Sequence, residues 1–163
     1  MSAAISPLRR PAVVAALAAS AVAVVGALET DIGAWYYALH KPAWQPPDWL
    51  FGPAWTVIFA LTAIAGATYW RRDRDRRARW ITLGAFAVNG ALNILWSLLF
   101  FRLHRPDWAL YEVGWLWLSV LAVLVRVRRA SGIAAWLLSP YLAWVAFAAL
   151  LNLTIVRLNG PFG

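Results

Sequence analysis

Residues 40–56 read HKPAWQPPDWLFGPAWT, and long apolar runs lie on both sides of this stretch. Its prolines remove backbone donors and fix φ, so one continuous helix cannot run through residues 40–53. The prolines are Pro42, Pro46, Pro47 and Pro53. Loops this long are usually functional or disordered, and disorder fits poorly because Trp35, Trp44 and Trp49 are costly to leave in water. We therefore expect residues 29–49 to form a stiff cover over the ends of neighbouring helices.

The composition indicates that lipid is the solvent of this chain. Of 163 residues, 63% are hydrophobic and 13% are charged, against about 25% charged in soluble domains. The mean hydropathy is +0.63. A domain this small could not bury so much apolar surface in water, and the length fits a single membrane domain over residues 1–163. Cysteine is absent, which excludes disulfides and thiolate ligands.

Five segments are apolar enough to cross a membrane, for which a helix needs about 20 residues. They cover residues 11–28, 50–70, 80–101, 108–125 and 130–156, with Glu112 placed in the first turn of the fourth. The first segment also has features of a cleavable signal peptide, but its length favours an uncleaved span. Backbone groups have no water in the bilayer core, so the spans should be helical. The predicted fold class is all-α, a polytopic bundle of five transmembrane helices covered at its outer end by the Trp/Pro-rich loop.

Lysine and arginine are distributed unequally between the two sides of this predicted bundle. One side carries Arg9 and Arg10, the RRDRDRRAR segment at 71–79, and Arg126, Arg128 and Arg129. The other side carries Lys41, Arg102, Arg105 and Arg157. The positive-inside rule then places the N-terminus in the cytoplasm and the first loop and C-terminus on the outer side. Because these cations flank apolar spans, we do not read the net charge of +8 as a nucleic-acid surface.

Polar and aromatic residues recur at helical spacing on three spans. The stripes are Trp55, Phe59 and Thr62; Asn89, Asn93, Trp96 and Phe100; and Tyr141, Trp144, Ala148, Leu151 and Asn152. Asparagine amides are expensive against lipid and should face the bundle interior, either to join helices or to contact a ligand. Together the stripes predict an aromatic and apolar cavity with a few amides, which suits a flat, mostly apolar ligand.

Chemistry that needs ionisable side chains has no visible apparatus in the spans. No carboxylate, histidine or lysine is expected in the middle of any span, and His40 and His104 lack metal-ligand spacing. Ion-coupled pumps normally carry buried ionisable groups, and hydrolases need a nucleophile with its base. We therefore expect no metal, no obligatory cofactor and no conventional hydrolytic enzyme.

Four segments, in order, resemble one known family: KPAWQPPDW, FGPAWTVIF, NGALNILWSLLFF and PYLAWVAFAALLNLTIVRLN. From residue 35 to residue 159 the chain resembles the translocator protein family, also called tryptophan-rich sensory proteins or peripheral benzodiazepine receptors. The resemblance implies a five-helix bundle, commonly a homodimer, in a membrane that we expect to be a bacterial cell membrane. It also implies binding of porphyrins such as protoporphyrin IX or haem, and in some members of cholesterol and benzodiazepine-type ligands.

The resemblance assigns pocket residues. Those that match the family motifs are Tyr36, Trp55, Phe59, Asn93, Trp96, Trp144, Ala148 and Leu151. To these we add Trp44 from the cover and Tyr141 from its stripe. Trp55 and Trp144 match the pair implicated in light-dependent porphyrin breakdown in some bacterial members, which makes them the candidate catalytic residues. The expected function is porphyrin binding in tetrapyrrole homeostasis or stress sensing. Carriage of small lipophilic molecules is the second alternative, and photo-oxidative degradation of porphyrin is the third.

Two further expectations concern sterols and assembly. The cholesterol pattern of the last helix in animal members needs a tyrosine, and LLNLTIVR has none. A reversed pattern runs from Arg105 through Tyr111 to Val113, but such patterns are weak, so we do not expect sterol binding. Small residues on the third span, Gly84, Ala87, Gly90 and Ala91, would suit either a homodimer contact or packing within one chain.

Overall fold

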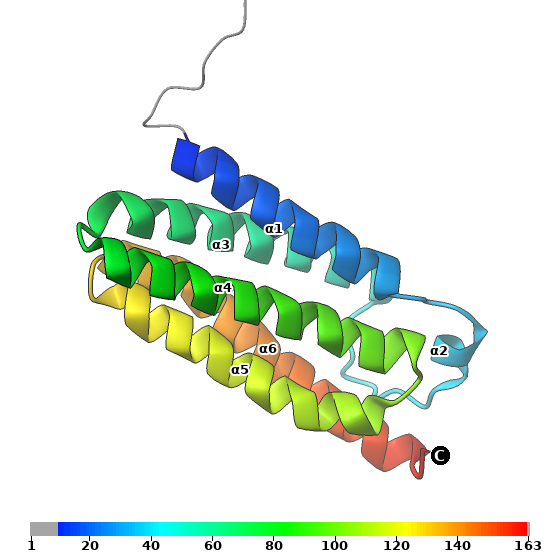
Figure 1. The fold of residues 1–163 in the computed structure, drawn as a ribbon. Coiled ribbons are helices and arrows are strands. Elements are labelled where there is room, and N and C mark those ends of the chain that lie inside the picture. The colour runs from blue at the N-terminus through cyan, green and yellow to red at the C-terminus, as the bar shows by residue number, and fades with distance from the viewer. Residues whose placement is uncertain (1–9, 163) are drawn as a thin grey trace, which may run out of the picture.

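The computed structural model describes residues 10–162, and this part of the chain contains five long helices (Figure 1). They are α1 (Arg10–Glu29), α3 (Phe51–Arg72), α4 (Arg76–Ser97), α5 (Pro106–Arg128) and α6 (Gly132–Asn159). Each is long and apolar enough to cross a membrane. The predicted spans differ from these helices by a few residues at each end, so the prediction of an all-α, five-span bundle is confirmed. Arg9, which was counted in the topology prediction, lies outside the described residues.

The helices form a closed ring in cross-section. α1 packs between α3 and α4, and the ring continues from α3 to α6, from α6 to α5, and from α5 back to α4. The C-terminus and the short helix α2 (Ala34–Ala38) lie at one end of the bundle, whereas the α3–α4 and α5–α6 connections lie at the other (Figure 1). The two ends therefore belong to different sets of loops.

Residues 30–50, which we call the lid, cross one end of the ring. Two turns hold the proline segment, with Gln45 N donating to Pro42 O and Leu50 N donating to Pro47 O, both at 2.9 Å. The lid ends in a single 3₁₀ turn, η1 (Asp48–Leu50), that leads into α3. Asn159 fixes the lid to the end of α6, because its Nδ2 donates to His40 O at 2.8 Å while its Oδ1 accepts from His40 N at 2.7 Å. The predicted cover over the helix ends is thus confirmed, but it does not bury all the indoles that favoured it, because Trp44 and Trp49 remain 46% and 72% exposed.

The arginine-rich segment at 71–79 is mostly helical rather than a loop. Arg71 and Arg72 form the last turn of α3, and α4 begins at Arg76, so only residues 73–75 connect the helices. Asp75 caps α4 by accepting a hydrogen bond from Arg77 N at 2.8 Å. Cations at the end of α3 also interact favourably with its macrodipole. Both effects allow the helices to continue beyond the apolar spans that hydropathy detects.

Pro140 lies inside α6 without ending it. Proline has no N–H, so the carbonyl of Trp136 one turn earlier loses its usual helical donor. Ser139 Oγ donates to that carbonyl at 2.7 Å and replaces the missing bond. A serine next to the proline therefore lets the helix continue through the bilayer.

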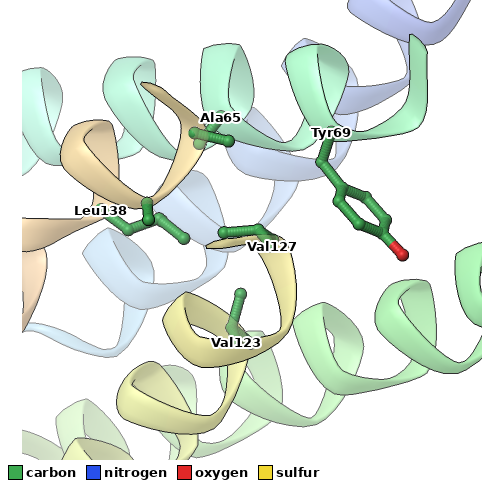
Figure 2. Close-up of a cluster of buried hydrophobic side chains, with 7 residues drawn as sticks. Ala65, Tyr69, Val123, Val127 and Leu138 are labelled. Carbon is green, nitrogen blue, oxygen red and sulfur yellow. The ribbon is translucent and has the colours of Figure 1, made fainter. Parts of the chain in front are cut away.

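A tightly packed cluster joins α3, α5 and α6 near the arginine-rich end. Figure 2 shows Ala65 of α3, Val127 of α5 and Leu138 of α6 pointing toward one another, with Val123 and Tyr69 beside them. Ala134 and Ala135 complete the cluster, which we call the solid core. Small and branched side chains interdigitate here with almost no exposed surface.

Candidate functional site

A cavity of about 710 Å³ lies beneath the lid, between α1, α3, α4 and α6. Small residues of α1 line one wall, namely Ala16, Ala19, Ser20, Ala23, Gly26 and Ala27, and Thr30 continues this wall at the start of the lid. Aromatic side chains from α3, α4, the π-helical turn η2 (Leu98–Arg102) and α6 line the other walls: Phe51, Trp55, Phe59, Trp96, Phe100, Phe101 and Trp144. The short side chains of α1 do not reach the aromatic rings on the opposite helices, so the space between them stays open.

The aromatic rings of the cavity hold one another in fixed orientations. Trp55 and Trp144 meet edge to face, with ring centroids 6.4 Å apart and an interplanar angle of 83°. Trp55 also stacks on Phe59 at 5.4 Å, and Trp96 stacks on Phe100 at 5.2 Å. Such offset and edge-to-face pairs are the favoured aromatic geometries. The walls therefore present flat apolar faces in defined orientations.

The three interior asparagines have different partners. Asn89 Nδ2 donates to Ser119 Oγ at 2.8 Å and joins α4 to α5. With its amide oriented to serve both groups, Asn152 donates to Pro106 O at 3.0 Å and accepts from Leu110 N at 3.1 Å, which fixes the start of α5. Asn93 Nδ2 donates to Tyr141 OH at 3.2 Å, and its Oδ1 faces α1, where a Cβ built on Gly26 would lie 3.9 Å away. Asn93 thus combines a helix contact with an acceptor at the cavity.

The lid end of the cavity is polar. Tyr36 OH donates to Asp48 Oδ1 at 2.7 Å, and Gln45 Nε2 donates to the same oxygen at 3.1 Å. Burial, followed by the hydrogen bond to Asp48, raises the pKa of Tyr36, so this phenol stays a neutral donor. Gln45 Oε1 is buried and has no hydrogen-bond partner among the described residues. Lys41 Nζ lies 4.1 Å from the centre of the Tyr36 ring and brings a cation to the same region.

The structure brings most of the predicted ligand-binding residues to this cavity. Tyr36, Trp55, Phe59, Asn93, Trp96, Trp144, Ala148 and Leu151 all line it. Trp44 and Tyr141 do not. Trp44 is an exposed lid residue that packs edge to face on Phe147, and Tyr141 lies behind the wall, where it holds Asn93 and contacts the Trp55 ring edge to face at 6.0 Å.

Several lining residues were missed from the sequence. Gln45 and Asp48 meet Tyr36 only through the folding of the lid, which no local pattern reveals. Phe101 lines the cavity beside Phe100 because the π-helical turn η2 (Leu98–Arg102) interrupts the α-helical spacing, with Leu103 N donating to Leu98 O at 2.9 Å. The α1 wall did have a signal, since its small residues recur every three or four positions.

Glu112 corrects one expectation. It lies in the second turn of α5 and not in the first, because the helix begins at Pro106, and only 6% of its surface is exposed. Neither carboxyl oxygen has a hydrogen-bond partner among the described residues. It does not line the cavity. The span therefore carries a buried acidic group that the length of the apolar run concealed.

The comparisons with known proteins agree with the fold and the motifs. The sequence profile of the TspO/MBR family matches residues 12–158. The chain is 40% identical over 130 residues to the tryptophan-rich protein TspO of Chlorobaculum tepidum, a match that covers 77% of this chain and 80% of the relative. It is 37% identical over 127 residues to protein CrtK of Rhodobacter capsulatus, covering 78% and 79%. It is also 33% identical over 126 residues to the human translocator protein, covering 77% and 75%.

Membership follows from these matches together with the five spans. The matched region runs from α1 to the end of α6 and includes the lid and every helix of the ring. The chain is an integral membrane protein and belongs to the TspO/MBR family.

Proposed function

We propose that the chain binds a porphyrin, such as protoporphyrin IX or haem, in the aromatic cavity and acts in tetrapyrrole homeostasis or stress sensing. The observation that carries this proposal is the pairing of a small-residue wall on α1 with fixed aromatic faces on the opposite helices. This arrangement leaves a space suited to a flat ring, with polar groups confined to the lid end and to Asn93.

The size and chemistry of the cavity support a ligand of this class. Its volume of about 710 Å³ falls within the range of about 300–1,000 Å³ typical of small-molecule sites. A tetrapyrrole offers a wide π-face to Trp55 and Trp144, and its apolar edge would rest against the alanines of α1. No metal-binding cluster of His, Asp or Glu exists among the described residues, and the proposal requires none.

The lid end would fix the orientation of the ligand. Protoporphyrin IX carries two carboxylic acid side chains, and the Asp48 carboxylate lines the same cavity. Like charges repel, so these acids would avoid the Asp48 carboxylate itself, and Lys41, whose ammonium group lies over the Tyr36 ring just outside the lining, would attract them to the mouth of the cavity. Gln45 Oε1 would accept a hydrogen bond from a donor on the ligand.

A titration of protoporphyrin IX into the purified protein tests the proposal. Saturable changes in porphyrin absorbance should give one site per chain, and Trp55→Phe with Trp144→Phe should weaken binding. The matched control is Trp115→Phe with Trp136→Phe, since these indoles are 67% and 79% exposed on the outer surfaces of α5 and α6. Equal affinity in the cavity pair and the wild type would place the ligand elsewhere.

A carrier for small lipophilic molecules is the second candidate. It is favoured by the lid, a separate segment held to the bundle by two hydrogen bonds of Asn159 and by the packing of Tyr36 on Phe101 and of Trp44 on Phe147. Opening would have to release these contacts. Porphyrin flux across sealed proteoliposomes would establish it. Binding without flux would leave the receptor role as the better account.

Light-dependent porphyrin breakdown is the third candidate, because Trp55 and Trp144 are adjacent indoles on the cavity wall. Indole is readily oxidised by a neighbouring photosensitiser in air. Illumination with excess porphyrin distinguishes the cases: repeated turnover would indicate an enzyme, whereas loss of less than one porphyrin per chain would indicate damage to the protein.

We also propose a topology and an assembly. The arginine-rich end would face the cytoplasm of a bacterial cell membrane, and the lid and C-terminus would face outward.

Gly84, Ala87 and Ala91 are exposed on α4 and would contact a second copy of the chain. Gly90 instead packs against α1 of its own chain, because a Cβ there would lie 2.9 Å from Val22. Ala87→Leu with Ala91→Leu should convert a dimer to a monomer in size-exclusion light scattering. Ala122→Leu, on an exposed position of α5, is the control.

A further inference from the structure

A second cavity, of about 420 Å³, lies at the arginine-rich end of the bundle, opposite the lid. The end of α3, the α3–α4 connection, the start of α4 and the α5–α6 connection surround it. It is lined by Tyr69, Arg72, Asp73, Arg74, Asp75, Ala78, Arg126, Arg129 and Ala130. Nothing in the proposed porphyrin site involves these residues.

The cations of this cavity outnumber its carboxylates and form no ion pair with a carboxylate of residues 10–162. Within the described residues, the only ion pair joins Arg105 and Asp107 at the other end of the bundle. Asp73 and Asp75 instead accept local hydrogen bonds. Asp73 accepts from Tyr69 OH and from Asp75 N, and Asp75 accepts from Arg77 N. The bond from Tyr69 is the main cause that lowers the pKa of Asp73, followed by the hydrogen bond from Asp75 N, and the charges of Arg79 and Arg126 contribute less.

A side-chain relay fixes one of these arginines at the cavity. Arg126 Nε donates to Thr82 Oγ1 at 3.2 Å, Thr82 Oγ1 donates to Tyr69 OH at 3.0 Å, and Tyr69 donates to Asp73. Thr82 and Tyr69 are buried, so the relay is anchored in the protein rather than in solvent. No hydrogen bond within residues 10–162 uses the Nη groups of Arg126. Its outer donors are therefore held at the cavity and left free for a ligand.

We infer that this cavity binds a phosphate group, carried either by the headgroup of an anionic lipid or by a small phosphate compound. Arginine forks match phosphate oxygens through paired, charge-assisted hydrogen bonds. The cavity lies where α3 and α5 end, which is the depth of lipid headgroups for helices that cross a bilayer. Ala78 and Ala130 are small and leave room for the group between the arginines.

Two double variants separate a built site from general surface charge. Arg72→Gln with Arg129→Gln removes two cavity arginines. Arg71→Gln with Arg128→Gln removes the same charge from the neighbouring positions of the same helix ends, where the side chains are exposed and do not line the cavity. Each purified protein is tested by native mass spectrometry with phosphatidylglycerol and with phosphatidylcholine, and by thermal unfolding with inorganic phosphate.

The wild type and the control pair should each retain phosphatidylglycerol saturably and release phosphatidylcholine. The cavity pair should bind phosphatidylglycerol about tenfold more weakly, as expected for lost charge-assisted hydrogen bonds. Saturable stabilisation by inorganic phosphate, lost only in the cavity pair and without preference for phosphatidylglycerol, would identify a free phosphate compound as the source. Equal weakening in both pairs, or no saturable binding of either probe, would overturn the inference.

Discussion

The solid core and the cavity beneath the lid are built from the same kind of apolar helices, yet one is filled and the other is hollow. In the solid core, Val123, Val127 and Leu138 interdigitate around Ala65, and almost no surface remains exposed (Figure 2). In the cavity, the alanines of α1 face rigid rings such as Trp55. In the solid core, branched side chains extend far enough to contact the small ones opposite them. In the cavity, the aromatic rings pack against one another and do not reach the small side chains of α1.

The two regions therefore stabilise the fold through different interactions. A membrane bundle gains little from the hydrophobic effect between its helices, so close packing and interior hydrogen bonds stabilise it. The solid core supplies the packing. The cavity wall costs the fold some of that packing, and the aromatic pairs and the Asn93–Tyr141 hydrogen bond hold its shape.

Adding a large side chain should give the largest difference in stability between the solid core and the cavity. Ala134→Phe inserts a ring into the solid core, where overpacking costs about 1–3 kcal/mol or more, and should lower the unfolding temperature markedly or prevent folding. Ala23→Phe inserts the same ring into the cavity and should leave the unfolding temperature nearly unchanged while abolishing porphyrin binding. Thermal unfolding and porphyrin titration of both variants measure this. A strongly destabilised Ala23→Phe would mean that Ala23 faces packed side chains and not open space.

Removing a side chain from the solid core should have the next largest effect. Leu138→Ala should destabilise the protein by about 2–5 kcal/mol through lost contacts and a new cavity. Leu150→Ala, on the exposed face of the same helix, should have little effect. Denaturant unfolding in mixed micelles compares the two. Similar losses for both variants would show that contacts with lipid matter as much as the solid core does.

Loosening the lid should change the kinetics of the cavity and leave the solid core intact. Asn159→Ala removes both hydrogen bonds to His40, and porphyrin should dissociate about threefold to tenfold faster, in line with one or two modest hydrogen bonds. Leu158→Ala, at an exposed neighbouring position, is the control. Stopped-flow competition gives the rates. An unchanged rate in Asn159→Ala would show that the ligand leaves by another route.

The smallest predicted effect concerns the charge at the lid end. Asp48→Asn keeps an acceptor for Tyr36 OH but removes the negative charge, so protoporphyrin IX should bind about threefold more tightly. Its dimethyl ester, which has no charged side chains, should bind both proteins equally. An equal gain for acid and ester would assign the effect to lid structure instead of charge.

The sequence was informative wherever a single helix decides the outcome. Hydropathy located the five spans, and helical spacing grouped Trp55 with Phe59 and Asn93 with Trp96, because both signals are local. It was less informative where two segments decide together. The cluster of Tyr36, Gln45 and Asp48 depends on the folded lid. Small residues do recur along one face of α1, but alanines also occur on its other faces, so the wall depends on which face turns inward. Hydropathy also missed the helical arginine segment and the burial of Glu112, since it averages over the side chains that break the pattern.

The most direct test of the account is a structure of the protein in lipid nanodiscs with protoporphyrin IX bound. If the porphyrin binds in the cavity, the macrocycle should lie between the α1 alanines and the rings of Trp55 and Trp144, beneath a closed lid, with its carboxylates toward Lys41. A macrocycle bound on the lipid-facing surface, with the space beneath the lid filled by side chains, would contradict it.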